Sequence, residues 1–227
     1  MINIKIINIE NKFECSFNKI NTLVIENPKL FRDTIINFLD ALQGDSSKII
    51  ITKNNDIYKI RNDIVLVNNY FDYNLSKKIN SAVNKSLLEK ISLNSNKYQQ
   101  YYQQGYSLFT DLFNDYNASI DINDELDVSL LIKLFNPNII FDCSNSNDRL
   151  DSLIKYINAL IEFFNLKIVI FVELESYFSI DEIEMIYKHC CYKQVSLFLL
   201  QSYHKYNLSN EKVVIIDKDL CEIDCKK

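Results

Sequence analysis

The chain has 227 residues, with 25 Lys and Arg against 30 Asp and Glu and a net charge of -5. This length lets one substantial domain, with or without a large insertion, bury a full core without disulfides. The negative charge excludes a protein that coats nucleic acid with its whole surface, so a nucleic-acid site would have to be local. The two glycines, Gly44 and Gly105, cannot form a GxxxxGK[ST] loop or a GxGxxG fingerprint. We therefore expect no nucleotide cofactor.

Six cysteines are present, and the sequence shows neither a signal peptide nor an apolar run approaching the length of a membrane span. We expect reduced thiols in a cytoplasmic protein. His189, Cys190 and Cys191 with Cys221 and Cys225 could suggest zinc, but neither cysteine pair has CxxC spacing, so burial of small thiols is the better interpretation. His204 follows a predicted strand, and the sequence assigns it no catalytic partner.

The N-terminal region is predicted to be mostly sheet. Residues 2–9 have β-branched character, 13–17 alternate like a hairpin partner, and 22–26 form a short buried run. Asn27 and Pro28 then supply an N-cap and a proline at the first helical position, and Gly44 ends the predicted helix over 28–42. Three more short strands are expected at 48–52, 57–60 and 64–67.

The same pattern returns near the C-terminus. Strands are predicted at 166–172, 195–200 and 213–216, and a helix over about 180–191 opens with the capping box that starts at Ser179. Between Leu75 and about Phe164 the pattern is helical and polar, apart from the ambiguous stretch 138–142, and a helix over 148–165 would bring the chain back. We therefore predict an α/β fold. Its head domain, a mixed β-sheet flanked by helices, comprises 1–74 and 166–227 and is interrupted by an extended α-helical arm over 75–165.

Charge within the predicted arm is segregated by sign. The stretch 74–104 carries five lysines against Glu89, whereas 106–127 carries six acidic residues and no basic one. The lysines are Lys77, Lys78, Lys85, Lys90 and Lys97. Lys78 and Lys85 are seven residues apart, on one helical face, where they could contact phosphates. The alternative is that these lysines are simply solvated.

The acidic stretch 121–127 places oxygen side chains at alternate positions, as the opening of a calcium loop does. The candidate metal ligands are Asp121, Asp124, Glu125 and Asp127. The stretch is not an EF-hand, because Leu126 stands where glycine is needed and Ile132 where a bidentate glutamate is needed. The alternative is an acidic N-terminal cap for the helix that starts near Leu126.

Read in order, three stretches resemble a known family. They are a strand, an acidic residue and a helix with Phe31 over Asn21–Arg32, a late strand, loop and capped helix over 166–183, and an acidic turn leading into a helix over 124–135. Together they are similar to the Csn-type ring-forming CRISPR-associated adaptation proteins of subtype II-A (the Csn-two family), and the resemblance runs over nearly the whole chain.

The resemblance implies a non-catalytic homotetrameric ring that threads onto the ends of double-stranded DNA without reading sequence. It implies a lumen lined by the arm lysines, calcium that stiffens the arms, and a head that has lost its nucleotide site. It also implies a role in spacer acquisition beside the spacer integrase and the RNA-guided nuclease of the same locus. The alternatives are a metal-dependent nuclease or phosphoryl-transfer enzyme that uses the carboxylates of 121–127, and a protein-interaction scaffold.

Overall fold

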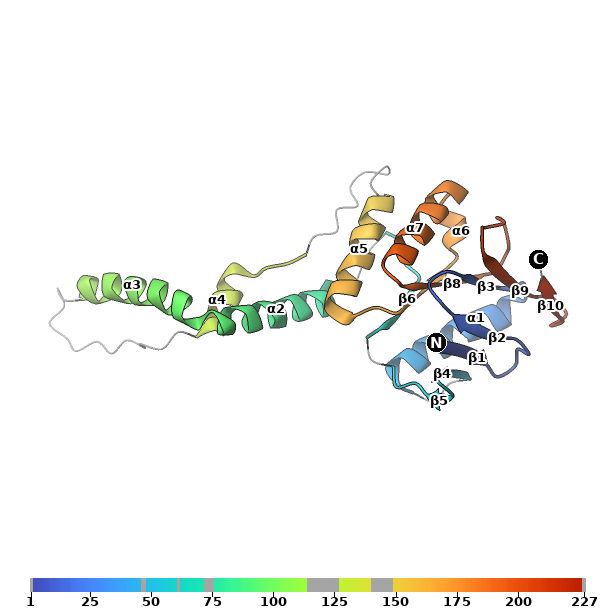
Figure 1. Cartoon of the computed structure of the whole chain (residues 1–227), viewed down its shortest axis with the longest axis horizontal. Coiled ribbons are helices and arrows are strands. Elements are labelled where there is room, and N and C mark those ends of the chain that lie inside the picture. Colours follow the sequence, from blue (N-terminus) through green and yellow to red (C-terminus); the bar gives the residue numbers. More distant parts are fainter. Residues whose placement is uncertain are drawn as a thin grey trace. The chain divides into compact units, whose positions relative to one another are not determined.

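The computed structural model describes residues 2–45, 48–60, 62–71, 76–113, 127–139 and 149–225. The chain forms two compact units. The head comprises Met1–Tyr73 and Phe141–Lys227, and the arm comprises Asn74–Ile140. The elements of both units are labelled in Figure 1.

The smaller sheet of the head has the strand order β2-β1-β4-β5 and is antiparallel throughout. Its strands are β1 (Ile2–Ile6), β2 (Lys12–Cys15), β4 (Ile49–Lys53) and β5 (Asp56–Ile57). Ile2, Ile4 and Ile6 of β1 point inward, because alternate residues of a strand face the same side. The predicted hairpin is confirmed, whereas β5 is only two residues long and ends where the strand predicted at 57–60 begins.

The larger sheet has the order β10-β9-β3-β8-β7-β6, and only β10 runs antiparallel to its neighbour. Its strands are β3 (Ile20–Ile25), β6 (Ile64–Val67), β7 (Ile168–Val172), β8 (Ser196–Gln201), β9 (Glu211–Ile216) and β10 (Glu222–Cys225). Every residue of β3, β7 and β8 is buried. A strand covered on both faces needs continuous rather than alternating apolar character, and the sequence supplies it here.

Helix α1 (Pro28–Gln43) joins the two sheets through one apolar core. Phe198 of β8 lies at its centre, with ring centroids 5.1 Å from Phe13 of β2 and 5.9 Å from Phe38 of α1, both edge to face. Asn27 caps the helix and Gly44 ends it at φ +86°, as the sequence predicts.

The other face of the larger sheet is covered by α5 (Arg149–Phe164), α6 (Leu174–Tyr177) and α7 (Ile180–Tyr192), as Figure 1 shows. The predicted capping box of α7 is present. The Ser179 side chain accepts from the Glu182 backbone N–H, and the Glu182 carboxylate accepts from the Ser179 backbone N–H at 2.7 Å. The α/β head with an inserted helical arm therefore has the predicted fold class.

One helix lies in a different unit from the one expected. We predicted that 75–165 belongs to the arm, but α5 groups with the head. Strands β6 and β7 are adjacent and parallel, with Ile64 opposite Ile168, so the chain between them is a crossover. A crossover returns through a helix that packs on the sheet, and α5 buries Leu153, Ile157 and Leu160 in this way. The arm is an insertion ahead of that returning helix.

The arm consists of α2 (Ser76–Leu93), α3 (Ser95–Phe113) and α4 (Val128–Phe135). The Asn80 side chain of α2 donates to Asn138 Oδ1 at 3.0 Å and accepts from the Ile139 backbone N–H at 3.0 Å. The described part of the ambiguous stretch, residues 138 and 139, is not a strand, and 140–142 lie outside the described residues. Among the described helices, none has both the length and the apolar character to span a membrane.

Candidate functional site

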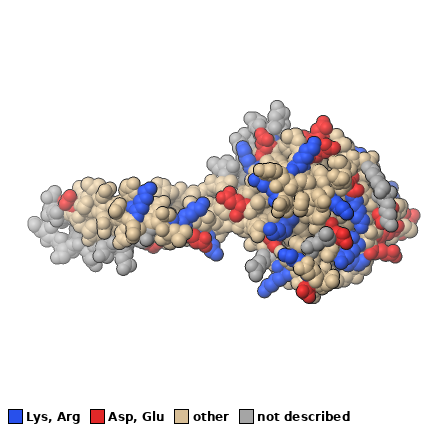
Figure 2. Space-filling model, viewed as in Figure 1, with Lys and Arg blue, Asp and Glu red and all other residues tan. Residues whose placement is uncertain are grey.

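The five predicted DNA-binding lysines are all exposed on arm helices. Lys77, Lys78, Lys85 and Lys90 lie on α2, and Lys97 lies on α3. At about 100° per residue, Lys77, Lys78 and Lys85 fall within about 100° of one another around α2, whereas Lys90 lies about 120° or more from each of them. These three lysines are called the α2 lysine face below. Figure 2 shows lysines on the visible face of the arm, set in largely uncharged surface.

Of the four predicted metal ligands, only Asp127 lies in the described part of the chain; Asp121, Asp124 and Glu125 do not. Asp127 caps α4, where its Oδ1 accepts from the Ser129 backbone N–H at 2.8 Å. Hydrogen bonding by Ser129, first through its side chain and then through its backbone N–H, holds the pKa of the Asp127 carboxyl below its usual value. The capping alternative accounts for Asp127 without a metal ion.

The connection from β3 to α1 is the place where a phosphate loop would lie in a nucleotide-binding sheet. Here Asn27 occupies that position. Its side-chain oxygen accepts from the backbone N–H groups of Lys29 and Leu30, each at 3.1 Å. Those are first-turn groups of the kind that hold phosphate at a helix N-terminus.

The histidine and cysteines considered above as zinc ligands each contact a different part of the chain or solvent. Cys190 is fully buried, and burial raises the pKa of its thiol to about 12. The His189 Nε2 lies 2.9 Å from Asn158 Oδ1, and the Cys191 thiol donates to the Phe17 carbonyl at 2.8 Å. Cys221 is exposed, and the side chain of Cys225 lies outside the described part. The prediction that a thiol is buried here is confirmed for Cys190.

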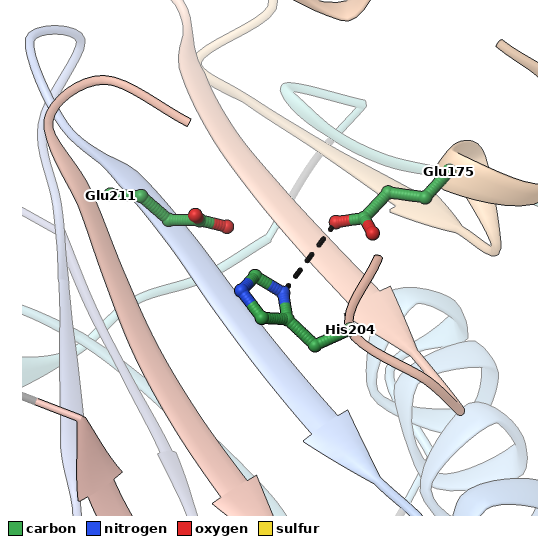
Figure 3. Close-up of side chains that lie close together, drawn as sticks. All are labelled: Glu175, His204 and Glu211. Carbon is green, nitrogen blue, oxygen red and sulfur yellow. Dashed lines mark ion pairs between the residues drawn. The ribbon is translucent and has the colours of Figure 1, made fainter. Parts of the chain in front are cut away.

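A different group of side chains converges in the head. Glu175 of α6, His204 of the β8–β9 connection and Glu211 at the start of β9 bring their ligand atoms within 4.8 Å of one another. Figure 3 shows the His204 ring lying between the two carboxylates. Among the described side chains, this is the one group of at least three His, Cys, Asp or Glu residues close enough to share an ion.

Each glutamate of this group also fastens the β8–β9 connection. Glu175 Oε2 accepts from the backbone N–H groups of Lys205 at 2.7 Å and Tyr206 at 3.2 Å. Glu211 Oε2 accepts from the Leu208 backbone N–H at 3.1 Å, and its Oε1 accepts from the buried Thr22 hydroxyl. The remaining Glu175 oxygen, Oε1, faces His204 Nδ1 at 3.8 Å, which is too long for a hydrogen bond.

Burial disfavours the charged form of Glu175 in this group. Glu175 is 2% exposed, and its Oε1 and the His204 Nδ1 are buried with no hydrogen-bond partner. Desolvation raises the pKa of the Glu175 carboxyl, and the nearby Glu211 carboxylate raises it further, against the lowering effect of the two backbone N–H groups and His204. Two carboxylates and an imidazole thus face one another in a poorly solvated place.

The sequence contains a signal for part of this group. Glu175 and His204 follow β7 and β8, which are neighbouring parallel strands, and the carboxyl ends of such strands meet at one edge of a sheet. Glu211 could not be found in this way, because it lies at the amino end of β9. It reaches the others because the β8–β9 connection runs back along the sheet to the start of the next strand.

The fold defines a class of protein: an α/β head that lacks a glycine-rich phosphate loop and carries a helical arm between two parallel strands. Residues 41–220 match the family model of the CRISPR-associated protein Cas_Csn2, and the chain belongs to that family. A solved structure, that of Stu0660 of Streptococcus thermophilus, has a similar fold, with a TM-score of 0.55 and 12% identity over 95% of this chain and 74% of that one. No curated protein sequence matches the chain.

Proposed function

We propose that the chain binds the ends of double-stranded DNA, without regard to sequence and without catalysis, as a homotetrameric ring that supports spacer acquisition in type II-A CRISPR immunity. Membership of a CRISPR-associated family supports the biological setting. The binding itself would occur in the cytoplasm and depend on the arm. The spacer integrase and RNA-guided nuclease of the same locus would be its partners.

The observation that carries the proposal is the α2 lysine face. Lys77, Lys78 and Lys85 are exposed, and among the described residues none of them forms an ion pair with a carboxylate. Lysine binds phosphate as a point charge and reads no base, so a surface of this kind binds DNA of any sequence. Repeating it in each subunit of a ring would compensate for the overall charge of -5 at the place where DNA passes.

Assembly is supported by an apolar stripe on α3. Tyr98, Tyr101, Gly105, Leu108 and Leu112 recur at spacings of three and four, which places them on one helical face. Leu108 is 67% exposed and Leu112 is 65% exposed. A stripe with this spacing on a helix is typical of a surface that packs against another helix, and a second copy of the chain would supply one.

The test compares linear with covalently closed circular duplex DNA at moderate salt and with calcium. We expect binding to linear DNA that weakens steeply as salt rises, and little binding to circles, because a closed circle has no end onto which a ring can thread. Equal affinity for both would contradict threading. Absence of binding to either would favour a protein-interaction scaffold, and cleavage of linear DNA on addition of Mg²⁺ or Mn²⁺ would favour the nuclease alternative.

The α2 lysine face has a matched control on the same helix. The double variant Lys78→Glu and Lys85→Glu should weaken binding to linear DNA equally for unrelated sequences, and should flatten the plot of log affinity against log salt by about one for each phosphate that the protein no longer neutralises. Lys90→Glu, on another side of α2, should have a smaller effect per charge. Equal effects per charge would show that the lysine face is not the DNA-binding side.

Calcium in the acidic stretch is part of the proposal and is tested separately. Asp121, Asp124, Glu125 and Asp127 would supply carboxylates to the ion, as oxygen ligands suit calcium. The variant Asp124→Asn with Glu125→Gln leaves the Asp127 cap intact and should remove the effect of calcium on DNA binding. If calcium acts equally on this variant, the ion is not held here.

A further inference from the structure

The meeting of Glu175, His204 and Glu211 is unexplained by DNA binding, because these side chains belong to the head and not to the arm. It is also unlike an ordinary surface cluster of acids. The Glu175 Oε1 and the His204 Nδ1 are both buried, they point at each other across 3.8 Å, and neither has a hydrogen-bond partner in the described part of the chain. Buried polar atoms nearly always have a hydrogen-bonding or ionic partner. Two such atoms that face each other without one therefore indicate a ligand between them.

Neighbouring lysines do not supply that partner. The Lys205 ammonium lies over the Tyr206 ring, 4.6 Å from its centroid. The Lys212 ammonium donates to Asn11 Oδ1 at 3.0 Å and to the Lys12 carbonyl at 3.3 Å. The two carboxylates therefore lie on either side of the His204 imidazole, which is the only described basic side chain that forms an ion pair with either of them, at 3.8 Å from Glu175.

We propose that Glu175, His204 and Glu211 bind a divalent transition-metal ion, for which Zn²⁺ is the best match. Imidazole nitrogen with carboxylate oxygen is a ligand set of zinc, and it is unsuited to calcium, which takes oxygen ligands. Ligand atoms within 4.8 Å of one another need only small side-chain rotations to surround an ion at about 2.0–2.2 Å. The His204 side chain is 20% exposed and Glu211 is partly exposed, which leaves a route of entry.

The bound ion would hold the β8–β9 connection against the neighbouring parts of the head. Its ligands come from the segment after β7, the connection itself and the first residue of β9, so one ion would tie three separate parts of the chain. The backbone N–H groups of Lys205, Tyr206 and Leu208 already hold the carboxylates in place as outer partners. We expect the ion to stabilise the folded chain and to slow hydrogen exchange in residues 202–210, because it binds a site that unfolding destroys.

The experiment uses the full chain, stripped of metal with a chelator and then titrated with Zn²⁺ by calorimetry, with thermal unfolding followed in parallel. His204→Gln and Glu211→Gln should each weaken zinc affinity by at least about tenfold, by removing one ligand. The matched control is His189→Gln, since His189 is the one other histidine of the chain and contacts Asn158. Glu211→Gln also covers the case in which a His204 variant folds poorly.

The expected result is one high-affinity zinc per chain in the parent and in His189→Gln, with a rise in melting temperature that both site variants lose. Ca²⁺ in excess should leave that zinc bound. The proposal would be overturned if the parent did not bind zinc, which is the result expected if the imidazolium and carboxylates pair only with one another. Equal zinc affinity in the parent and the site variants would also overturn it, and so would displacement of the zinc by calcium.

Discussion

At the scale of single residues, burial distinguishes the thiols of Cys15 and Cys190 from the thiol of Cys221. Cys15 and Cys190 are buried, and desolvation raises the pKa of each thiol to about 12, so that only about one thiol in ten thousand is ionised at pH 8. Cys221 is exposed. The thiolate is the reactive form, so iodoacetamide at pH 8 should alkylate Cys221 in the native protein and leave Cys15 and Cys190 unmodified until denaturant is added. Peptide mass spectrometry measures this, and native modification of Cys190 would contradict it.

His189 links stability to pH. Burial, with a smaller effect from Lys193, lowers the pKa of its imidazole below the ordinary value of 6.5. The unfolded chain therefore binds more protons at this residue as pH falls through 6.5, and acidification from pH 7.5 to 5.5 favours unfolding. In His189→Gln the urea midpoint should fall less between these two pH values than in the parent. An equal fall in both proteins would remove His189 as a contributor.

The partners of individual side chains could be predicted from the sequence only where both partners are close together along the chain. The capping box of Ser179 and Glu182 was predicted because its partners are three residues apart. The partner of His204 was missed because Glu175 is on another element, and the 3.8 Å approach of the two exists only once β7 and β8 are paired. Long-range convergence of this kind follows from topology, not from local pattern.

At the scale of elements, α1 depends on its two ends. Asn27→Ala removes the oxygen that accepts from Lys29 and Leu30 and should lower the free energy of unfolding by about 1 kcal/mol, whereas Asn27→Ser keeps a capping oxygen and should cost less. Chemical denaturation measures both. If Asn27→Ser costs as much as Asn27→Ala, the loss comes from something other than the cap.

At the other end of α1, stability depends on the backbone conformation of Gly44. Its φ of +86° is left-handed, and a Cβ added there would meet nothing within 4 Å, so only backbone conformation opposes a side chain. Gly44→Ala should lower the free energy of unfolding by about 1 kcal/mol, and Gly44→Asn by less, since asparagine tolerates this conformation better. Equal losses in the same denaturation experiment would argue against a conformational origin.

The fully buried strands of the larger sheet and its edge strand β6 were predictable, whereas the other edge strand, β10, was not. Continuous apolar runs identified β3, β7 and β8, because burial on both faces leaves a strong signal. β10 has the sequence Glu-Ile-Asp-Cys and carries no such signal. It is held by pairing with β9 and by the Glu222 carboxylate, which accepts from the Asn11 backbone N–H at 2.8 Å.

At the scale of the whole molecule, the division into head and arm follows from one crossover. The sequence predicted a split head because strand patterns recur at both ends of the chain, and it placed the arm boundary too late because α5 has the same helical periodicity as the arm. Only the pairing of β6 with β7 shows that α5 is the returning helix of the crossover. Leu153, Ile157 and Leu160 on its buried face distinguish it from α3, whose apolar stripe is exposed.

That exposed stripe is where assembly can be tested apart from DNA binding. In the proposed ring, Leu108 and Leu112 pack against another subunit, so the double variant Leu108→Asp and Leu112→Asp places charges in the interface and should reduce the mass of the particle in solution. Met185→Asp is the matched control, because Met185 is similarly exposed but lies on α7 of the head. Light scattering should give a tetramer for the parent and for Met185→Asp, and a smaller species for the arm variant with unchanged circular dichroism. A parent that is already monomeric, or an arm variant that keeps the parent's mass, would rule out this stripe as the assembly surface.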